Sequence, residues 1–279
     1  MVNPGGIKAL ALDLDGTILA AGAVLNERTV RAVKKCMRRG IRIIIATGRS
    51  IEAAEPYALA LGAEGPMICF NGALVVDMPG GGILSASLLG REAAEFCVDI
   101  AREMGLYCQV FFPGPGDDFR MTFMAERDSP EREMYHEHTG LLAELGDLKE
   151  ALSRPGFRGC FKCMFLSEPE VQAALRLRLK EHFGGSVYIV QTMRTFLEVM
   201  DTRASKGLGL KTAMEKLSLK SGEIIAFGDE ENDLPMFSIA GFSAAPSSAK
   251  DAVKAQADLV IGSNDDDGVA AFLEEFFGL

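Results

Sequence analysis

The first 80 residues alternate between short apolar runs and segments in which apolar residues recur every three or four positions. The run at 41–46 is almost continuously apolar, as is typical of a strand buried on both faces of a sheet. In chain order, the expected elements are a strand over 7–14, a helix between Asn26 and Gly40, a strand over 41–46, a helix over 50–61 and a strand over 67–70. This βαβαβ order predicts a parallel sheet with right-handed crossovers.

The same alternation returns near the carboxyl terminus. Ser205 is placed to cap a helix that runs to Leu217, and the apolar run at 224–227 predicts another buried strand. The remaining expected elements are a helix over 234–240, a strand over 258–261 and a helix over 269–277. These elements extend the α/β pattern of the amino-terminal segment.

The regular alternation of strands and helices is absent between the two α/β segments. Strand-like runs are expected over 107–112, 121–125, 159–166 and 187–191, and long helices over 91–104 and 169–183. This mixture is typical of an α+β domain. The sequence therefore predicts a doubly wound, parallel-sheet core formed by residues 1–80 and 193–279, into which an α+β domain formed by residues 81–192 is inserted.

The composition limits the kinds of partner that the protein can have. Of its 279 residues 48% are hydrophobic and 24% charged, which is enough apolar material for a large core. The net charge of −10, with dispersed Lys and Arg, argues against a nucleic-acid surface. No apolar run approaches the ~20 residues of a membrane span, and the first run meets Asp13 too early for a signal peptide. We expect a cytoplasmic protein without nucleic-acid or membrane partners, and the sequence leaves its oligomeric state open.

Six cysteines raise the question of a metal or disulfide site. Only Cys160 and Cys163 have the spacing of metal ligands, and a strand over 159–166 would direct residues three apart to opposite faces of its sheet. No second pair completes a four-ligand site. We expect the cysteines to pack as small hydrophobic side chains.

Two carboxylates close the first apolar run. Asp13 and Asp15 are separated by one residue, so in an extended strand their side chains project on the same face. Two acids held this close repel each other unless a cation lies between them or one of them keeps its proton. Gly16 then allows a tight turn, and Thr17 adds a hydroxyl at its exit. The pattern indicates chemistry rather than a simple turn.

Further polar residues follow the other expected strands. Thr47 ends the second strand, and an acidic run that contains Asp229 and Asp233 follows the strand at the other end of the chain. In open α/β sheets, ligands bind at the carboxyl ends of the strands, where all of these residues are expected. Together with Asp13 and Asp15, the acidic run predicts an oxygen cage for Mg²⁺, which prefers a few carboxylates together with water and substrate phosphate.

A carboxylate cluster that meets an anionic substrate needs compensating hydrogen-bond donors. The segment Thr47-Gly48-Arg49-Ser50 offers a hydroxyl and the amides of a turn, and Lys206 offers an ammonium group at the start of a helix. This combination of donors suits a phosphoryl group.

At these positions the sequence resembles the haloacid dehalogenase (HAD) superfamily, and within it the Cof-like phosphatases, which carry a large, C2-type cap domain inserted between the second and third motifs. The first to fourth motifs are matched by Asp13-Leu14-Asp15-Gly16-Thr17, Thr47-Gly48-Arg49, Lys206-Gly207 and Gly228-Asp229-x-x-Asn232-Asp233. Further similarity lies in Asn71-Gly72-Ala73, in Glu198 and in the tail from Ala257 to Val269. The segment Ala244-Ala245-Pro246-Ser247 departs from the Met-Gly-Asn-Ala that is frequent in relatives, so the resemblance assigns no contact to that loop.

The resemblance implies a Mg²⁺-dependent phosphatase that hydrolyses small phosphorylated metabolites, such as sugar phosphates, through an aspartyl phosphate. Asp13 would be the nucleophile and Asp15 the general acid and base. Phosphoryl oxygens would be bound by Thr47, Gly48, Lys206 and Asn232, and Mg²⁺ by Asp13, the backbone carbonyl of Asp15, Asp229 and Asp233. The inserted domain would close over the site as a cap and select the leaving group.

Three other functions make different demands on the sequence than a phosphatase does. A phosphomutase or phosphotransferase would use the same Asp13 intermediate and pass the phosphoryl group to an alcohol other than water, and the sequence leaves this alternative open. A receiver-type signalling module would be shorter and would need no inserted domain. A nicotinamide dehydrogenase would need Gly-x-Gly-x-x-Gly after the first strand, where this chain has Asp-Gly-Thr. Sugar phosphates, nucleotides, flavin mononucleotide and pyridoxal phosphate all remain compatible as substrates.

Overall fold

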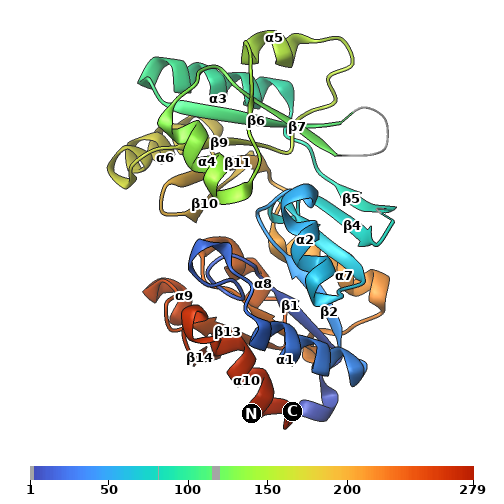
Figure 1. The fold of residues 1–279 in the computed structure, drawn as a ribbon. Coiled ribbons are helices and arrows are strands. Elements are labelled where there is room, and N and C mark those ends of the chain that lie inside the picture. Colours follow the sequence, from blue (N-terminus) through green and yellow to red (C-terminus); the bar gives the residue numbers. More distant parts are fainter. Residues whose placement is uncertain (1–2, 81, 115–119) are drawn as a thin grey trace. The chain divides into compact units, whose positions relative to one another are not determined.

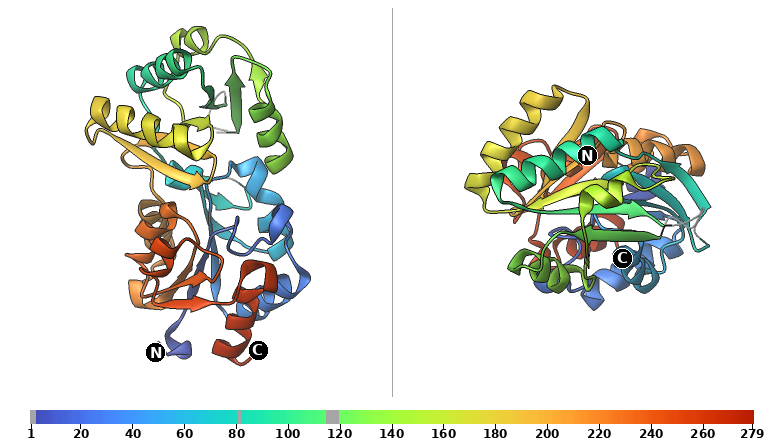
Figure 2. Two further views of the ribbon diagram at one scale, coloured as in Figure 1. Left: turned by 90° about the vertical axis from the view of Figure 1, so that its left-hand side faces the viewer. Right: turned by 90° about the horizontal axis from the view of Figure 1, so that it is seen from above.

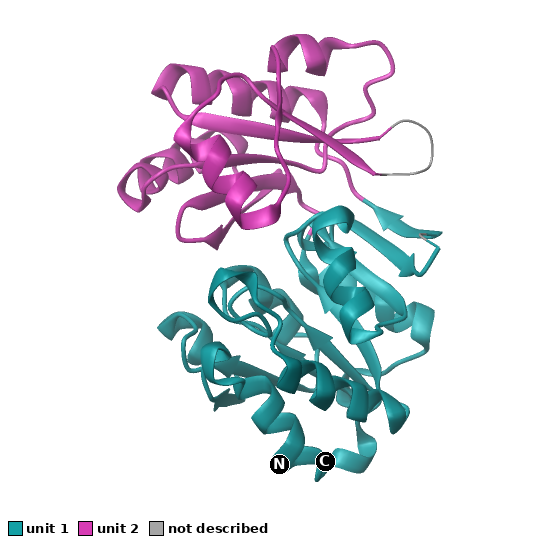
Figure 3. Ribbon diagram, viewed as in Figure 1, with its two compact units in different colours: residues 1–86, 205–279 teal, residues 87–204 magenta. Residues whose placement is uncertain are grey.

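The computed structural model describes residues 3–80, 82–114 and 120–279 and groups the chain into two compact units (Figures 1 and 3). Unit 1 contains residues 1–86 and 205–279, and unit 2 contains residues 87–204. The sequence suggested 81–192 for the inserted segment. Residue 81 itself lies outside the described residues.

Unit 1 is built on an eight-stranded sheet in the order β14-β13-β12-β1-β2-β3-β4-β5. Its strands are β1 (Ala9–Leu12), β2 (Arg42–Ala46), β3 (Gly65–Cys69), β4 (Leu74–Met78), β5 (Gly82–Ala86), β12 (Ile224–Phe227), β13 (Phe242–Pro246) and β14 (Leu259–Ile261). Neighbouring strands from β14 to β3 run parallel, and β4 and β5 are added in antiparallel direction. The predicted α/β core with a parallel sheet is confirmed.

Helices cover both faces of this sheet. They are α1 (Glu27–Arg38), α2 (Ile51–Leu61), α7 (Lys206–Leu217), α8 (Leu234–Phe237), α9 (Asp251–Lys254) and α10 (Gly268–Phe277). Side chains of α7, α8 and α9 share one core with Ala11, Ile44 and Ala226 of the sheet. Phe272 of α10 contacts Phe227, whose side chain lies on the opposite face, and α10 also packs against α1. Each sheet face is therefore buried, which explains why these strands are almost entirely apolar.

Several helix ends follow directly from the local sequence. The hydroxyl of Ser50 accepts a hydrogen bond from the backbone of Ala53 at the start of α2, and Ser205 caps α7 in the same way. Asn26 precedes α1 as expected, but its side chain makes no capping hydrogen bond and instead donates to Asp267 at 2.9 Å. Asn26 therefore stands at the N-cap position without capping α1 through its side chain, because Asp267 offers a charged acceptor.

Unit 2 contains a six-stranded sheet in the order β10-β11-β9-β6-β7-β8. Its strands are β6 (Tyr107–Pro113), β7 (Met121–Ala125), β8 (Glu144–Leu145), β9 (Lys162–Leu166), β10 (Val187–Met193) and β11 (Phe196–Asp201), and its helices are α3 (Arg91–Met104), α4 (Pro130–Thr139), α5 (Leu148–Ser153) and α6 (Pro169–Phe183). Because β11 pairs with both β9 and β10, residues 196–201 belong to this sheet, and the unit ends at Ala204 rather than at residue 192.

The two faces of the second sheet are covered differently (Figure 2). Helices α3, α5 and α6 bury one face in a core that includes Val110, Phe165 and Val199. On the other face, Tyr135 of α4 packs against the rings of Phe111 and Phe196. Unit 2 thus has its own hydrophobic core, as expected of an α+β domain.

The cysteines are buried and free, as expected for small hydrophobic side chains. The prediction that Cys160 and Cys163 face opposite sides is wrong, since both lie in the core between the sheet and α3. The reason is that β9 begins only at Lys162, so Cys160 precedes the regular strand. Within the described ranges, each helix is too short or too polar to cross a bilayer.

Candidate active site

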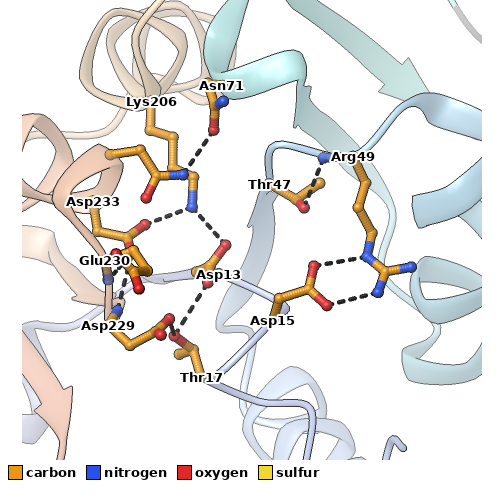
Figure 4. A network of polar contacts seen from close by, with 11 residues as sticks. Asp13, Asp15, Thr17, Thr47, Arg49, Asn71, Lys206, Asp229, Glu230 and Asp233 are labelled. Carbon is orange, nitrogen blue, oxygen red and sulfur yellow. Dashed lines mark hydrogen bonds and ion pairs between the residues drawn. The ribbon is translucent and has the colours of Figure 1, made fainter. Parts of the chain in front are cut away.

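Four neighbouring parallel strands of unit 1, in the order β12-β1-β2-β3, are each followed by a polar residue. Asp13 follows β1 and Thr47 follows β2 directly, while Asn71 and Asp229 come two positions after β3 and β12. Because adjacent parallel strands end at the same edge of a sheet, these residues converge although they are far apart in the chain (Figure 4). This is the edge at which the sequence predicted a ligand site.

Three carboxylates meet at this edge. One side-chain oxygen each of Asp13, Asp229 and Asp233 lies within 4.8 Å of the others, and Asp13 and Asp233 are 5% and 0% exposed. Oδ2 of Asp233 accepts hydrogen bonds from the backbone N–H groups of Asp229 and Glu230 at 2.9 and 3.0 Å. Gly16 (φ +73°) permits the close approach, because a Cβ there would lie 2.2 Å from Oδ2 of Asp229.

Lys206 and Thr17 tie the three carboxylates together. Nζ of Lys206 lies 2.5 Å from Oδ1 of Asp13 and 2.6 Å from Oδ1 of Asp233, and the lysine is 1% exposed. The hydroxyl of Thr17 lies 3.2 Å from Oδ2 of Asp13 and 2.8 Å from Oδ1 of Asp229. These contacts hold the carboxylates in fixed positions (Figure 4).

The electrostatics of the cluster follow from this crowding. Burial raises the pKa of Asp13 from 3.8 to about 7, against the lowering effect of Lys206 and together with the raising effect of Asp233. Burial, followed by the charges of Asp13 and Asp233, raises the pKa of Asp229 from 3.8 to about 9. Burial lowers the pKa of Lys206, but its two carboxylate partners more than offset this, so that its pKa is raised overall. Three acids around one ammonium thus leave an excess of negative charge that a divalent cation would relieve.

Asp15 lies beside this cluster and has a different partner. Its Oδ2 and Oδ1 accept hydrogen bonds from Nε and Nη2 of Arg49 at 2.7 and 2.6 Å, which is a two-point ion pair (Figure 4). The Arg49 side chain is 5% exposed and that of Asp15 26%. The guanidinium carbon of Arg49 also lies 5.2 Å from the centre of the Tyr57 ring. The planar, buried fork fixes the position of the Asp15 carboxylate.

Three more residues with predicted roles surround the cluster. Thr47 is 1% exposed, and its hydroxyl oxygen accepts the backbone N–H of Arg49 at 3.1 Å. Asn232 is 4% exposed and donates from Nδ2 to Oδ1 of Asn71 at 2.8 Å. A Cβ at Gly48 would lie 3.1 Å from that same oxygen. Asn71 therefore lies between the loop of Thr47 and Gly48 and the loop of Asn232.

The predicted site residues fall into three groups in the structure. Asp13, Lys206, Asp229 and Asp233 form the central cluster, Asp15 pairs with Arg49, and Thr47, Gly48 and Asn232 lie around Asn71. The sequence assigned no partner to Thr17, Arg49 or Asn71, although Thr17 and Arg49 stand in the matched motifs and Asn71 in a further segment of similarity. Their partners could not be read from the sequence, because Thr17 contacts Asp229, which is 212 positions away, and Arg49 contacts Asp15, which is 34 positions away.

The residues of the cluster fit a divalent metal ion of the Mg²⁺ type. Their ligand atoms are hard carboxylate oxygens, which Mg²⁺ prefers. In addition, Oδ1 of Asn232 is buried without a hydrogen-bond partner among the described residues, as expected of an atom that faces a bound ligand or water.

Comparison with known proteins shows which proteins this chain is similar to. Residues 10–273 match the haloacid dehalogenase-like hydrolase family. Pyridoxal phosphate phosphatase YbhA of Escherichia coli (strain K12) is 27% identical over 279 residues, which cover 95% of this chain and 97% of the relative. The 5-amino-6-(5-phospho-D-ribitylamino)uracil phosphatase YwtE of Bacillus subtilis (strain 168) is 27% identical over 290 residues, which cover 96% and 98%. The crystal structure of a haloacid dehalogenase-like hydrolase from Bacteroides thetaiotaomicron, 24% identical, has a TM-score of 0.82 over 97% of this chain and 100% of its own.

Proposed function

Because this chain belongs to the haloacid dehalogenase-like hydrolase family and is a phosphoric monoester hydrolase, we propose that it hydrolyses small phosphorylated metabolites through an aspartyl phosphate formed on Asp13. The observation that supports this proposal most strongly is the environment of Asp13. Its carboxylate is buried at the end of β1, touches the ammonium group of Lys206 and shares a cluster with two further carboxylates.

The first half of the reaction forms the aspartyl phosphate. An oxygen of Asp13 attacks phosphorus, the bond from phosphorus to the leaving oxygen breaks, and that oxygen takes a proton from Asp15. In the second half, Asp15 removes a proton from water, the water oxygen attacks phosphorus, and inorganic phosphate leaves Asp13. Lys206 holds Asp13 and offsets charge during both halves. Two easier displacements thus replace one difficult displacement.

Asp15 is placed for proton transfer by Arg49. Since Arg49 occupies both oxygens of Asp15, a proton can pass only when one of these hydrogen bonds is exchanged for the leaving oxygen or for water. The partial exposure of Asp15, 26% against 7% for the side chain of Asp13, gives it the access to water that the second half requires.

Phosphoryl oxygens are bound by donors around the cluster. The hydroxyl of Thr47, the backbone amide of Gly48, the ammonium group of Lys206 and the second N–H of the Asn232 carboxamide supply these donors in our proposal. They come from the ends of different strands, so that together they fix the phosphoryl group for in-line attack.

Mg²⁺ completes the proposed site. Asp13, Asp229, Asp233 and the backbone carbonyl of Asp15 would hold it, and when bound it neutralises the paired acids and polarises the phosphoryl group. The pKa values of Asp13 and Asp229 are raised first by burial and then by neighbouring carboxylates, and a bound cation would oppose both effects by favouring the ionised acids. With the cation present, Asp13 is ionised and therefore nucleophilic.

Substrate selection belongs to the inserted segment in our proposal. The two relatives named for pyridoxal phosphate and for a phosphoribitylaminouracil match this chain over 95% and 96% of its length. Both names describe small phosphate monoesters, and we propose the same substrate class here. The inserted segment, predicted at 81–192 and represented in our proposal by the compact unit of residues 87–204, would act as the cap that contacts the leaving group.

A panel of phosphorylated metabolites tests the proposal. Wild-type protein with Mg²⁺ is expected to release inorganic phosphate from at least one small monoester, and Asp13→Asn protein from none. Excess chelator is expected to abolish release, and Ca²⁺ to inhibit it, because its larger and more flexible coordination shell suits in-line displacement poorly. Phosphate release that is unchanged in excess EDTA, or retained by Asp13→Asn, would contradict the proposed mechanism.

A further inference from the structure

The short turn Phe70–Gly72 after β3 has an unusual backbone. Phe70 (φ +48°) and Asn71 (φ +52°) are both left-handed, and Gly72 follows with φ +94°. Asparagine tolerates this conformation, but a bulky residue such as phenylalanine rarely adopts it. Consecutive left-handed residues persist only where the surroundings hold them, and such segments concentrate at functional sites.

Backbone contacts attach this turn to two of the motif loops. The N–H groups of Phe70 and Asn71 donate to the carbonyl oxygens of Arg49 and Thr47, both at 2.9 Å. Gly72 is tight against the start of α7, because a Cβ there would lie 2.1 Å from the carbonyl oxygen of Ser205. The turn is therefore fixed between the second motif and the helix that begins with Lys206.

The side chain of Asn71 adds a third connection. Asn71 is completely buried, and its Oδ1 accepts a hydrogen bond from Nδ2 of Asn232 at 2.8 Å. Nδ2 of Asn232 thus has a hydrogen-bond partner in Asn71, whereas Oδ1 of Asn232 has none among the described residues. Asn71 thus determines how the Asn232 carboxamide is turned within the site.

We propose that Asn71 is a positioning residue, which holds the carboxamide of Asn232 in the orientation required for phosphoryl transfer. The left-handed turn places its side chain where Asn232 can reach it, and the backbone hydrogen bonds keep that position in register with Thr47. This inference rests on the proposed function of the site, since Asn232 is taken to contact the phosphoryl group.

A double-mutant cycle tests the proposal. Asn71→Gly removes the carboxamide, and glycine adopts the positive φ of this position without steric strain. With p-nitrophenyl phosphate and Mg²⁺, Asn71→Gly and Asn232→Ala are each expected to lower kcat/KM about tenfold or more. The kcat/KM of the double variant is expected to be no lower than that of the less active single variant. Losses that multiply in the double variant, or an unchanged Asn71→Gly enzyme, would overturn the inference.

Ser218→Gly is the matched control for the backbone change. Ser218 is also left-handed (φ +54°), but it lies beyond the end of α7 opposite to Lys206. The control carries the same glycine entropy cost and is expected to keep wild-type kinetics. A loss of activity in Ser218→Gly similar to that in Asn71→Gly would show that the effect is not specific to the site.

A second measurement does not depend on turnover. The side-chain amide protons of Asn232, identified by their absence from the ¹H–¹⁵N spectrum of Asn232→Ala, are expected to exchange slowly in wild-type protein and faster in Asn71→Gly. If these protons exchange in wild-type protein as fast as those of an exposed asparagine, the inference is overturned, even if Asn71→Gly does not fold. If wild-type protein releases no phosphate from any monoester, the proposed function fails, and this exchange measurement still decides whether Asn71 holds Asn232.

Discussion

Asp13 and Asp15 are one residue apart, yet their surroundings assign them different chemistry. Asp13 is buried against an ammonium group and two carboxylates, while Asp15 is partly exposed and bound by a guanidinium fork. A buried, fixed carboxylate suits attack on phosphorus, and a carboxylate with access to water suits proton transfer. The two roles that we propose for the pair therefore follow from environment, because the residue type is the same.

Replacing Asp15 tests this division of roles. Asp15→Asn is expected to lower kcat/KM for alkyl phosphates about 10²- to 10⁴-fold, because the leaving alkoxide needs a proton. With p-nitrophenyl phosphate, whose leaving group hardly needs protonation, the variant is expected to give a burst of nitrophenol and then stall. Stopped-flow absorbance measures both phases, and Asp266→Asn on the surface is the control. Equal losses for the two substrate classes would contradict the assignment.

Asp229 allows a test of the cluster electrostatics by stability. Its pKa is raised from 3.8 to about 9 by burial first and then by neighbouring carboxylates, so the folded state retains a proton that the unfolded chain releases. Without metal, this contribution to stability is full below pH 4 and is lost as the pH rises towards 9, by at most about 1.4 kcal/mol per pH unit. The Asp229→Asn variant has no ionisable carboxyl group at this position, so it does not lose this stability as the pH rises.

We therefore expect Asp229→Asn to be more stable than wild-type protein in EDTA, by a margin in Tm that grows from pH 5 to pH 9. Mg²⁺ is expected to raise the Tm of wild-type protein at pH 8 and to have little effect on the variant, because the cation compensates the same charge. Differential scanning calorimetry measures both effects. A margin that shrinks with rising pH would show that Asp229 is ionised without metal.

Much of the site could be predicted at this scale because the motif residues are close in sequence to strand ends. Asp13, Thr47 and Asp229 each follow a recognisable apolar run, and the sheet brings them together. The pairing of Asp15 with Arg49 could not be predicted in the same way, since both residues stand in motifs and either could have faced the phosphoryl group. Only the packed positions of the two loops decide which partner each side chain meets.

Single elements were predictable to the extent that their signals were local. Helices α3 and α6 match the predicted ranges, because Gly and Pro residues mark their ends: Gly90 and Gly105 flank α3, Pro169 begins α6 and Gly184 follows it. Strand β13 was missed, since Ala244, Ala245 and Pro246 carry little strand propensity and acquire their conformation from pairing with β12 and β14. The sequence wrongly assigned the residues of β11 to the core. The sheet that a strand joins depends on its pairing partners, which for β11 are β9 and β10.

The turn after β3 gives a prediction at the element scale. Gly72 and Gly80 both have positive φ, +94° and +104°, but only at Gly72 would a Cβ meet backbone atoms. Gly80→Ala is expected to cost about 1 kcal/mol, the price of the strained conformation alone. Gly72→Ala is expected to cost at least twice as much, because Ser205 at the start of α7 must also move. Urea unfolding measures both, and equal costs would show that the turn is not fixed against α7.

At the scale of the whole molecule, the chain consists of a core assembled from both ends and a segment with its own sheet. The break in the alternation of strands and helices indicated this insertion in the sequence. The contacts between residues within the second unit extend to residue 204, twelve residues beyond the predicted end at 192. The difference matters for any truncated protein, because β11 separated from β9 and β10 would expose a strand edge and apolar side chains.

A core without the inserted segment tests the role proposed for it. Removal of residues 87–204, with a short Gly-Ser linker between Ala86 and Ser205, is expected to give a folded protein, whereas removal of 81–192 is expected to give an aggregating one. The folded core retains the carboxylate cluster and is expected to keep a trace of aryl phosphatase activity without discrimination among metabolites. Full selectivity in the shortened protein would place substrate recognition in the core loops.

The covalent intermediate on Asp13 is the most direct test of the account as a whole. Wild-type protein mixed with p-nitrophenyl phosphate and Mg²⁺, quenched in acid within milliseconds and digested, is expected to yield the peptide that contains Asp13 with the mass of one added phosphoryl group. Asp13→Asn protein is expected to yield none, and Asp15→Asn protein to accumulate more than wild type. Phosphoryl label on any other residue, or label on the Asp13→Asn protein, would contradict the central claim that Asp13 is the nucleophile.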